Sequence, residues 1–132
     1  MSDLFKKLNL KTQAVILVLH SPESFDAELS KLKDIRIHKD LKAVKTIDFV
    51  IAFVASAEEV ERLVGPVKEK APGDAVVWFA YPKTTSNIFD VQINRDRGWD
   101  ALESAGFKAV RQVSIDQDWS ALRFRRKTFV GK

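Results

Sequence analysis

Three apolar stretches constrain the fold of this chain more than any other feature of its sequence. They cover residues 15–19, 47–54 and 75–80 and are rich in Val, Ile, Phe and Trp. A strand with one wet face alternates apolar and polar residues, whereas a strand buried on both faces is apolar almost throughout. The three stretches therefore predict adjacent, parallel strands in the middle of a sheet that helices cover on both sides.

Helical signals separate these stretches. The pair Ser21-Pro22 predicts the start of a helix that continues to about residue 32, because serine caps helices and proline suits their first position. Ser56 and Glu59 form a capping-box pattern at the start of a second helix. Pro66 lacks an amide hydrogen, so we expect that helix to kink or to end near Val64.

The last third of the chain predicts one more helix and a hairpin. The helix is expected to start near residue 94 or 96, to turn Trp99 inward and to stop at Gly106. Residues 107–115 and 119–126 then read as two strands, and their short link allows only an antiparallel hairpin. A short strand at residues 35–38 completes a single α/β domain over residues 1–132.

This order of elements resembles the fold of the class I S-adenosylmethionine-dependent methyltransferases, in which a parallel sheet ends in an antiparallel strand. Residues 47–51 resemble the fourth strand of these enzymes, residues 72–80 their fifth strand with its turn, and residues 106–124 their closing hairpin. The resemblance implies a reduced three-layer α/β sandwich with a mostly parallel sheet. Its sheet order would be 2-1-3-4-6-5, with strands numbered along the chain and strand 6 antiparallel.

Three shorter segments carry a narrower resemblance. They are Trp-Phe-Ala-Tyr-Pro-Lys at 78–83, Asn-Arg-Asp-Arg-Gly-Trp at 94–99 and Asp-Trp-Ser-Ala-Leu-Arg-Phe-Arg at 118–125. Together they resemble a family of small bacterial domains of unknown function. This resemblance covers most of the chain and implies no activity.

The turn after the first strand argues against a bound cofactor. Methyltransferases hold S-adenosylmethionine with a glycine-rich turn at this place, where backbone amides approach the ligand. Residues 20–24 read His-Ser-Pro-Glu-Ser, without glycine, and Pro22 removes one amide donor. We therefore expect no cofactor, and methyl transfer remains an alternative.

Few other residues suggest catalysis. The chain has no cysteine and only two histidines, His20 and His38, which are too few for an ordinary metal site, so none is expected. It has no Walker loop, and its five glycines are too few for a phosphate-cradling loop. Asp116 and Asp118 either pair as catalytic carboxylates or form the hairpin turn.

One connection invites a ligand. Residues 81–93 form a loop of about a dozen residues that starts at the carboxyl end of a central strand, the edge where open α/β sheets bind ligands. His20 ends the first strand at this edge, Tyr81 and Lys83 begin the loop, and Arg95 follows it near a helix start that favours anions. These four residues predict a site for a small anionic ligand or a partner, and the alternative is a plain surface loop.

The net charge of +4 has a local origin. Residues 123–132 contain five basic residues and no acid, which leaves 17 basic and 18 acidic residues elsewhere. A neutral body argues against a nucleic-acid binder, and the basic end is either solvated or meets an acidic partner. No stretch approaches the roughly 20 apolar residues of a membrane span, and no signal peptide is recognisable, so we expect a cytoplasmic protein.

These features together predict a non-catalytic binding or interaction domain on a degenerate methyltransferase-like fold. Its expected partner is a small anionic ligand or a protein, and not a membrane. An enzyme that acts on a small anionic substrate is the first alternative. A methyltransferase and a nucleic-acid binder are the further ones.

Overall fold

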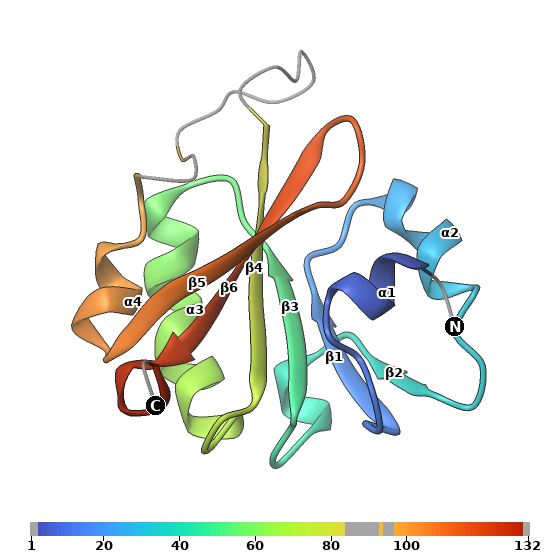
Figure 1. Ribbon diagram of the computed structural model, residues 1–132, viewed down its shortest axis with the longest axis horizontal. Helices are drawn as coiled ribbons and strands as arrows, with labels where there is room; N and C mark the ends of the chain where they lie inside the picture. Colours follow the sequence, from blue (N-terminus) through green and yellow to red (C-terminus); the bar gives the residue numbers. More distant parts are fainter. Residues whose placement is uncertain (1–2, 84–92, 94–96, 131–132) are drawn as a thin grey trace.

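A single mixed sheet of six strands organises the chain, as the computed structural model shows for residues 3–83, 93 and 97–130 (Figure 1). The elements, in chain order, are α1 (Asp3–Lys7), β1 (Val15–Leu19), η1 (Glu23–Phe25), α2 (Asp26–Leu29), β2 (Arg36–His38), η2 (Leu41–Ala43), β3 (Phe49–Phe53), α3 (Ala57–Lys70), β4 (Val76–Pro82), α4 (Asp100–Ser104), β5 (Phe107–Ser114), β6 (Trp119–Arg126) and η3 (Lys127–Phe129). The sheet order is β2-β1-β3-β4-β6-β5, with β6 antiparallel to both of its neighbours. The predicted order and strand directions are confirmed.

The three central strands are the apolar stretches of the sequence. β3 lies between β1 and β4, and all three run in the same direction. Every residue of β3 and β4 is buried, and in β1 only Val15 is partly exposed. The absence of alternation in these stretches thus reflects cover on both faces of the sheet.

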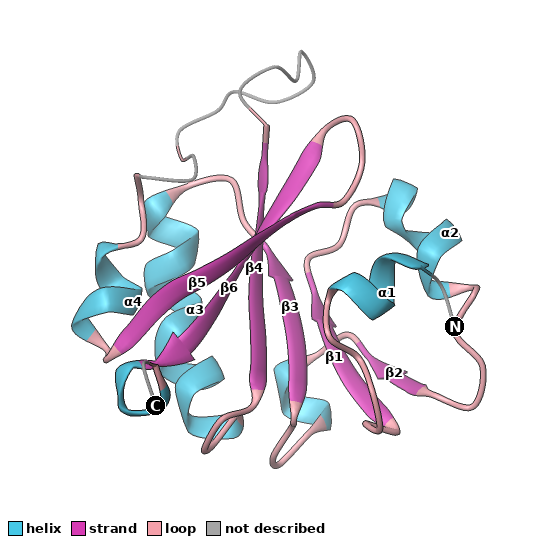
Figure 2. Cartoon of the chain, in the orientation of Figure 1, coloured by secondary structure: helices cyan, strands magenta, loops and turns pink. Residues whose placement is uncertain are grey.

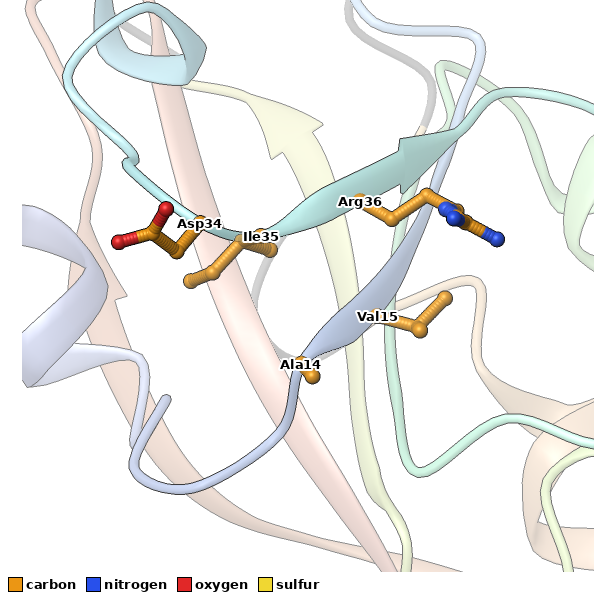
Figure 3. Close-up of a pocket in the computed structure, with 5 residues that line it drawn as sticks. All are labelled: Ala14, Val15, Asp34, Ile35 and Arg36. Atoms are coloured by element: carbon orange, nitrogen blue, oxygen red, sulfur yellow. The ribbon is translucent and has the colours of Figure 1, made fainter.

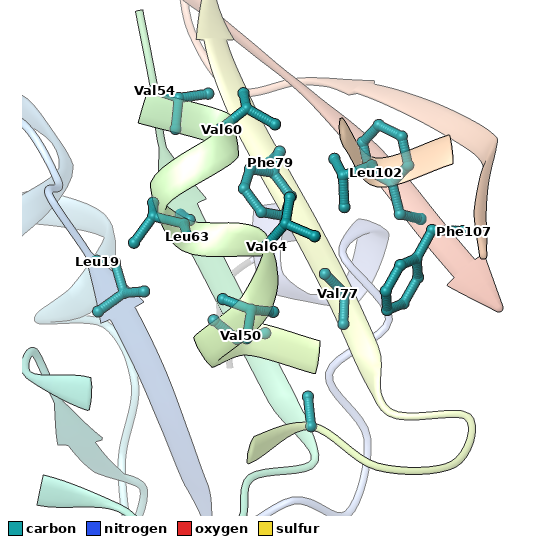
Figure 4. Packing of buried hydrophobic residues seen from close by; sticks show 14 of the residues in the cluster. Leu19, Val50, Val54, Val60, Leu63, Val64, Val77, Phe79, Leu102 and Phe107 are labelled. Atoms are coloured by element: carbon teal, nitrogen blue, oxygen red, sulfur yellow. The ribbon is translucent and has the colours of Figure 1, made fainter. Parts of the chain in front are cut away.

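Helices α3 and α4 cover one face of the sheet. Figure 4 shows Val60, Leu63 and Val64 of α3 packed against side chains of the central strands. The hydroxyl of Ser56 accepts a hydrogen bond from the backbone N–H of Glu59 at 3.3 Å, so the predicted cap is present. This face holds an aromatic cluster in which Trp99, Phe79 and Phe124 meet.

Of the two outcomes predicted for Pro66, the early end near Val64 is wrong, because α3 continues through Pro66 to Lys70. Proline removes one backbone hydrogen bond, but Leu63 and Val67 on either side of it are buried in the core. At the end of the helix the ammonium of Lys70 donates to the carbonyl oxygens of Leu41 and Val44. These contacts outweigh the single bond that proline forgoes.

Helices α1 and α2 lie on the opposite face, toward β1 (Figure 2). The ring of Phe5 in α1 packs near Phe25, and Phe25 meets Phe53 edge to face with ring centroids 4.9 Å apart. The indole N–H of Trp78 donates to the carbonyl oxygen of Leu8 at 2.8 Å, which ties the end of α1 to β4. The sequence analysis does not predict α1, a helix of five residues.

The first predicted helix is shorter than expected. Residues 23–25 form a 3-10 turn, and the α-helix covers only Asp26–Leu29. Phe25 and Leu29 are buried in the core. The chain then turns through Asp34, whose φ of 60° is left-handed, and enters β2 two residues later. A longer helix would leave too few residues to reach that strand.

The third predicted helix also starts later, at Asp100. Gly98 has a φ of 103°, which breaks helical geometry, and a Cβ there would lie 2.2 Å from the Ile93 side chain. Gly106, with a φ of 94°, ends the helix as predicted. Within the described ranges, no helix is long and apolar enough to cross a membrane.

The basic end of the chain is not a solvated tail, because its arginines belong to β6. Arg125 donates from Nε and Nη2 to the two carboxylate oxygens of Asp74 at 2.9 and 2.6 Å. Arg126 donates to the carbonyl oxygens of Lys68, Ala71 and Gly73, each at 3.0 Å. These carbonyls lie at and just beyond the end of α3, where a cation is favourable.

Candidate functional site

The predicted site lies at the carboxyl ends of β1, β3 and β4. His20 directly follows β1 and Lys83 directly follows β4, with β3 between the two strands. The register sets Leu19 level with Phe79, so Lys83 lies three residues beyond the level of His20. Two strand spacings separate the two backbones by about 10 Å across the sheet, and three residues add about 10 Å along it.

The structure therefore places His20 and Lys83 on the same edge but does not bring them into contact. Tyr81 lies on β4, close to Lys83. Arg95 lies outside the described residues. Of the four predicted residues, Tyr81 and Lys83 thus share one part of the edge.

His20 lies in a turn and has a backbone conformation that glycine adopts more readily than other residues. Its φ is 56°, in the left-handed region, and its side chain is exposed. Pro22 follows with an extended backbone, and its carbonyl oxygen accepts from the N–H of Phe25 at 2.9 Å. The turn is thus compact like a glycine turn, yet it carries an imidazole and lacks one amide donor.

Tyr81 is a core residue with a polar end. It is 3% exposed, and its ring packs edge to face on Trp99 with centroids 5.7 Å apart. Its hydroxyl oxygen accepts a hydrogen bond from Nε2 of Gln112 at 2.8 Å. Gln112 also contacts the hydroxyl of Ser120, the cross-strand partner of Tyr81, at 3.4 Å. The tyrosine hydroxyl therefore ties β4 to the hairpin.

Tyr81, Gln112 and Ser120 form a polar row, and Lys83 extends this row toward the solvent. Its backbone N–H donates to the carbonyl oxygen of Asp118 at 2.8 Å, and its ammonium donates to the hydroxyl of Ser114 at 2.7 Å. An ammonium has three hydrogens, and a serine hydroxyl can accept and donate at once. The pair formed by Lys83 and Ser114 can therefore hold its own contact and still offer hydrogens to an anion.

Three hairpin residues of this row, Gln112, Ser114 and Ser120, were not predicted from the sequence. They lie on the same face of the sheet as Tyr81 because the register pairs Ser114 with Ser120 and Ser120 with Tyr81. The sequence did contain a signal for them, namely polar residues two positions apart in β5 that lie across from the apolar side of β6. Using it required the residue register between β4, β6 and β5, which a predicted sheet order does not supply.

Of the two interpretations of the acidic link, the geometry supports the turn. One carboxylate oxygen of Asp116 accepts from the backbone N–H groups of Asp118 and Trp119, both at 2.8 Å. Over the described ranges, no three His, Asp or Glu side chains gather into a group that could hold a metal ion.

A hollow of about 420 Å³ lies at the opposite, amino-terminal edge of the sheet. Figure 3 shows its lining residues on β1, on β2 and just before each strand: Ala14, Val15, Asp34, Ile35 and Arg36. Three of these are apolar, and the two charged side chains extend away from each other. The hollow lacks the convergent polar groups of a ligand site.

Several solved structures share this architecture. A SAM-dependent methyltransferase from Aquifex aeolicus has 14% identity and a TM-score of 0.62 over 91% of this chain and 86% of that chain. The ribosomal protein L11 methylase of Lactobacillus delbrueckii subsp. bulgaricus has 15% identity and a TM-score of 0.57 over 93% and 76%. The N-methyltransferase NodS of Bradyrhizobium japonicum has 12% identity and a TM-score of 0.56 over 92% and 91%.

No protein-family model matches the sequence, and no curated protein matches it significantly. At identities of 12 to 15%, the similarity to these enzymes concerns the fold and not the activity. Together with the sheet order, it shows that the chain has the methyltransferase-like form of the Rossmann fold.

Proposed function

We propose that this chain is a non-catalytic binding domain that takes a small anionic ligand at the carboxyl edge of its sheet. The observation that carries the proposal is the pair formed by Lys83 and Ser114 at 2.7 Å. Lys83 is anchored at two points, by its backbone N–H on the carbonyl oxygen of Asp118 and by its ammonium on the hydroxyl of Ser114. A cation held in place in this way loses little conformational entropy when an anion binds.

The turn after β1 supports binding without S-adenosylmethionine. The imidazole of His20 and the ring of Pro22 occupy the turn that is rich in glycine in cofactor-binding methyltransferases. Pro22 cannot donate from its backbone, and a side chain at His20 takes up space beside the strand end. Both features weaken a cradle made of backbone amides.

A methyltransferase is the second candidate, and the fold favours it. The three solved structures compared above carry that activity in their names, and each aligns with at least 91% of this chain. Lys83 and the turn at His20 would then contact a methyl acceptor and the cofactor, respectively.

Calorimetry and thermal unfolding distinguish the two candidates. We expect S-adenosylmethionine at millimolar concentration to give no saturable heat. We expect pyrophosphate to raise the melting temperature, because a ligand that binds only the folded state stabilises it. Lys83→Gln should abolish that rise, and Lys45→Gln, an exposed change of equal charge, should preserve it.

Two results would overturn the proposal. One is a dissociation constant for S-adenosylmethionine below ~100 μM, equivalent to about −5.5 kcal/mol, which would favour the methyltransferase. The other is a pyrophosphate effect that Lys83→Gln leaves unchanged, which would place the anion elsewhere on the molecule.

A further inference from the structure

Half of the hairpin carries four cations on one face. The register pairs Lys108 with Arg125 and Arg111 with Arg123 across the two strands. Cross-strand partners share a face of the sheet, and so do positions two apart along one strand. A bulge between Ala109 and Arg111 keeps Lys108 and Arg111 on the same face although they are three residues apart. We call these four residues the cationic face.

The cationic face lies on the side of the sheet opposite α3 and α4. Phe124 and Leu122, which alternate with its arginines in β6, point into the core under those helices. On the cationic side, α1 and α2 lie toward β1 and leave uncovered the half of the hairpin that carries the four cations (Figure 2). Lys108 and Arg111 are accordingly exposed, and Arg123 and Arg125 are half-buried.

The positive charge of this face is poorly balanced. Asp74 neutralises Arg125 through a bidentate ion pair. Within the part of the chain that the structure describes, Lys108, Arg111 and Arg123 form no ion pair. The buried Nε of Arg123 also has no hydrogen-bond partner there.

This arrangement is unfavourable for the fold alone. Like charges directly opposite each other destabilise a sheet. Burial has the largest effect on Arg123 and lowers its pKa below the ordinary value. The charge of Arg125 and, less strongly, that of Arg111 lower this pKa further, and Asp74 offsets them in part. An anionic partner would relieve this repulsion and give the open guanidinium groups acceptors.

We propose that the cationic face binds the phosphate backbone of a nucleic acid. Its cations repeat about 5 Å apart across the strands and about 7 Å apart along β6, so they form a block that suits a repeating anion. Guanidinium groups bind phosphate oxygens through two parallel hydrogen bonds. This surface is separate from the carboxyl edge, and the inference does not rest on the function proposed above.

One feature favours a nucleic acid over an acidic peptide. A second feature favours contacts to phosphates over contacts to bases. The bulge in β5 interrupts the edge on which a peptide could add as a further strand. Trp119, on the same side of the hairpin, is buried against Phe53 and offers no stacking surface. Binding should therefore depend strongly on salt and little on sequence.

The neutral body of the chain was expected to argue against a nucleic-acid binder. That argument placed the basic excess on a tail, whereas Arg123 and Arg125 lie in the sheet. Two further cations from β5, Lys108 and Arg111, complete one surface with them. The local charge of a face decides binding, and the charge of the remaining chain matters less.

Fluorescence anisotropy with a labelled oligonucleotide of mixed sequence, as a single strand and as a duplex, tests the proposal. We expect a dissociation constant of about 10⁻⁴ to 10⁻⁶ M that weakens steeply between about 50 and 200 mM salt. The double variant Lys108→Gln/Arg111→Gln should raise the dissociation constant roughly tenfold. It should also reduce the salt slope for the single strand by about 1.4, from two lost phosphate contacts.

The double variant Lys33→Gln/Lys45→Gln is the matched control, since it removes the same charge from exposed positions outside the cationic face. It should change the dissociation constant less than about twofold. Asp74→Asn provides an opposite test, because it releases Arg125 and should tighten binding. Thermal unfolding of each variant verifies that it folds.

Several outcomes would overturn the inference. They are the absence of saturable binding to either form near 50 mM salt, an equal loss in the control, and weaker binding by folded Asp74→Asn. Equal affinity for poly-glutamate would likewise overturn it, and would point to an acidic protein as the partner.

Discussion

The sheet has two halves that differ in how they are covered. β1, β3 and β4 lie between helices, and every residue of β3 and β4 is buried. In β5, by contrast, only Phe107 and Val113 are buried, and from Leu122 to Arg125 β6 alternates core residues with arginines. The central strands build the core and reach a candidate ligand only where β4 ends, at Lys83, whereas the hairpin half exposes charge that its own fold does not neutralise. The difference teaches that the open half is the place to look for partners.

The largest expected effect is in the covered half. Phe79→Ala should destabilise the chain by about 3–5 kcal/mol, because a fully buried ring that contacts Phe124 and Trp99 leaves a cavity. Val110→Ala, at a residue 39% exposed in the hairpin, should change stability by less than about 0.5 kcal/mol. Urea unfolding measures both. Similar losses in the two variants would remove the distinction between the halves.

Arg126 in β6 stabilises the fold. Arg126→Gln should cost about 1–2 kcal/mol, because it removes three hydrogen bonds to carbonyls around the end of α3 and a cation held 5.2 Å from the ring centre of Phe107. Arg111→Gln, on the cationic face, serves as the comparison in the same unfolding experiment. A loss of 1 kcal/mol or more in Arg111→Gln would mean that both faces are structural.

The pair between Asp74 and Arg125 should give a smaller, pH-dependent effect. The hydrogen bond from Arg125 holds the pKa of Asp74 below its ordinary value of 3.8. The stabilisation is therefore present above that value and is lost as the pH falls through the lower pKa of the folded state. Both side chains are about a third exposed, so we expect less than about 1 kcal/mol.

The measurement is the difference in unfolding free energy between the native chain and Asp74→Asn at several pH values. This difference should be constant near neutral pH and should shrink toward zero below pH 3.8. A difference that persists unchanged in acid would show that the carboxylate contributes through packing and not through its charge.

The smallest expected effect has the opposite sign. Arg111→Gln should stabilise the chain by a few tenths of a kcal/mol at low salt, because Arg111 and Arg123 are like charges directly across the hairpin. The gain should disappear at high salt, where exposed charges are screened. Lys45→Gln is the control in the same salt series. Destabilisation by Arg111→Gln at low salt would show that the cations do not repel each other.

The sequence was sufficient for most of the fold because its signals were local. Apolar stretches without alternation identified the central strands, and the short link at residues 116–118 required the hairpin. The errors have physical causes. Pro66 does not end α3, because the residues around it pack into the core. Helix α1, with five residues, is too short to give a periodic pattern.

The candidate sites were harder to predict because they depend on neighbours in space. Lys83 was recognised from its position after a strand, but its partner Ser114 required the residue register between β4, β6 and β5. The cationic face was missed for a similar reason. Lys108 and Arg111 share a face only because of one β-bulge, and no residue type in this segment predicts that bulge.

Two-dimensional NMR of the ¹⁵N-labelled chain, titrated with pyrophosphate and then with an oligonucleotide, tests the difference between the two halves most directly. The account predicts that pyrophosphate shifts amides near Lys83 and Ser114. The oligonucleotide should instead shift those of the four residues on the cationic face, Lys108, Arg111, Arg123 and Arg125. Shifts of one common set of amides by both ligands, or shifts confined to the covered strands, would contradict it.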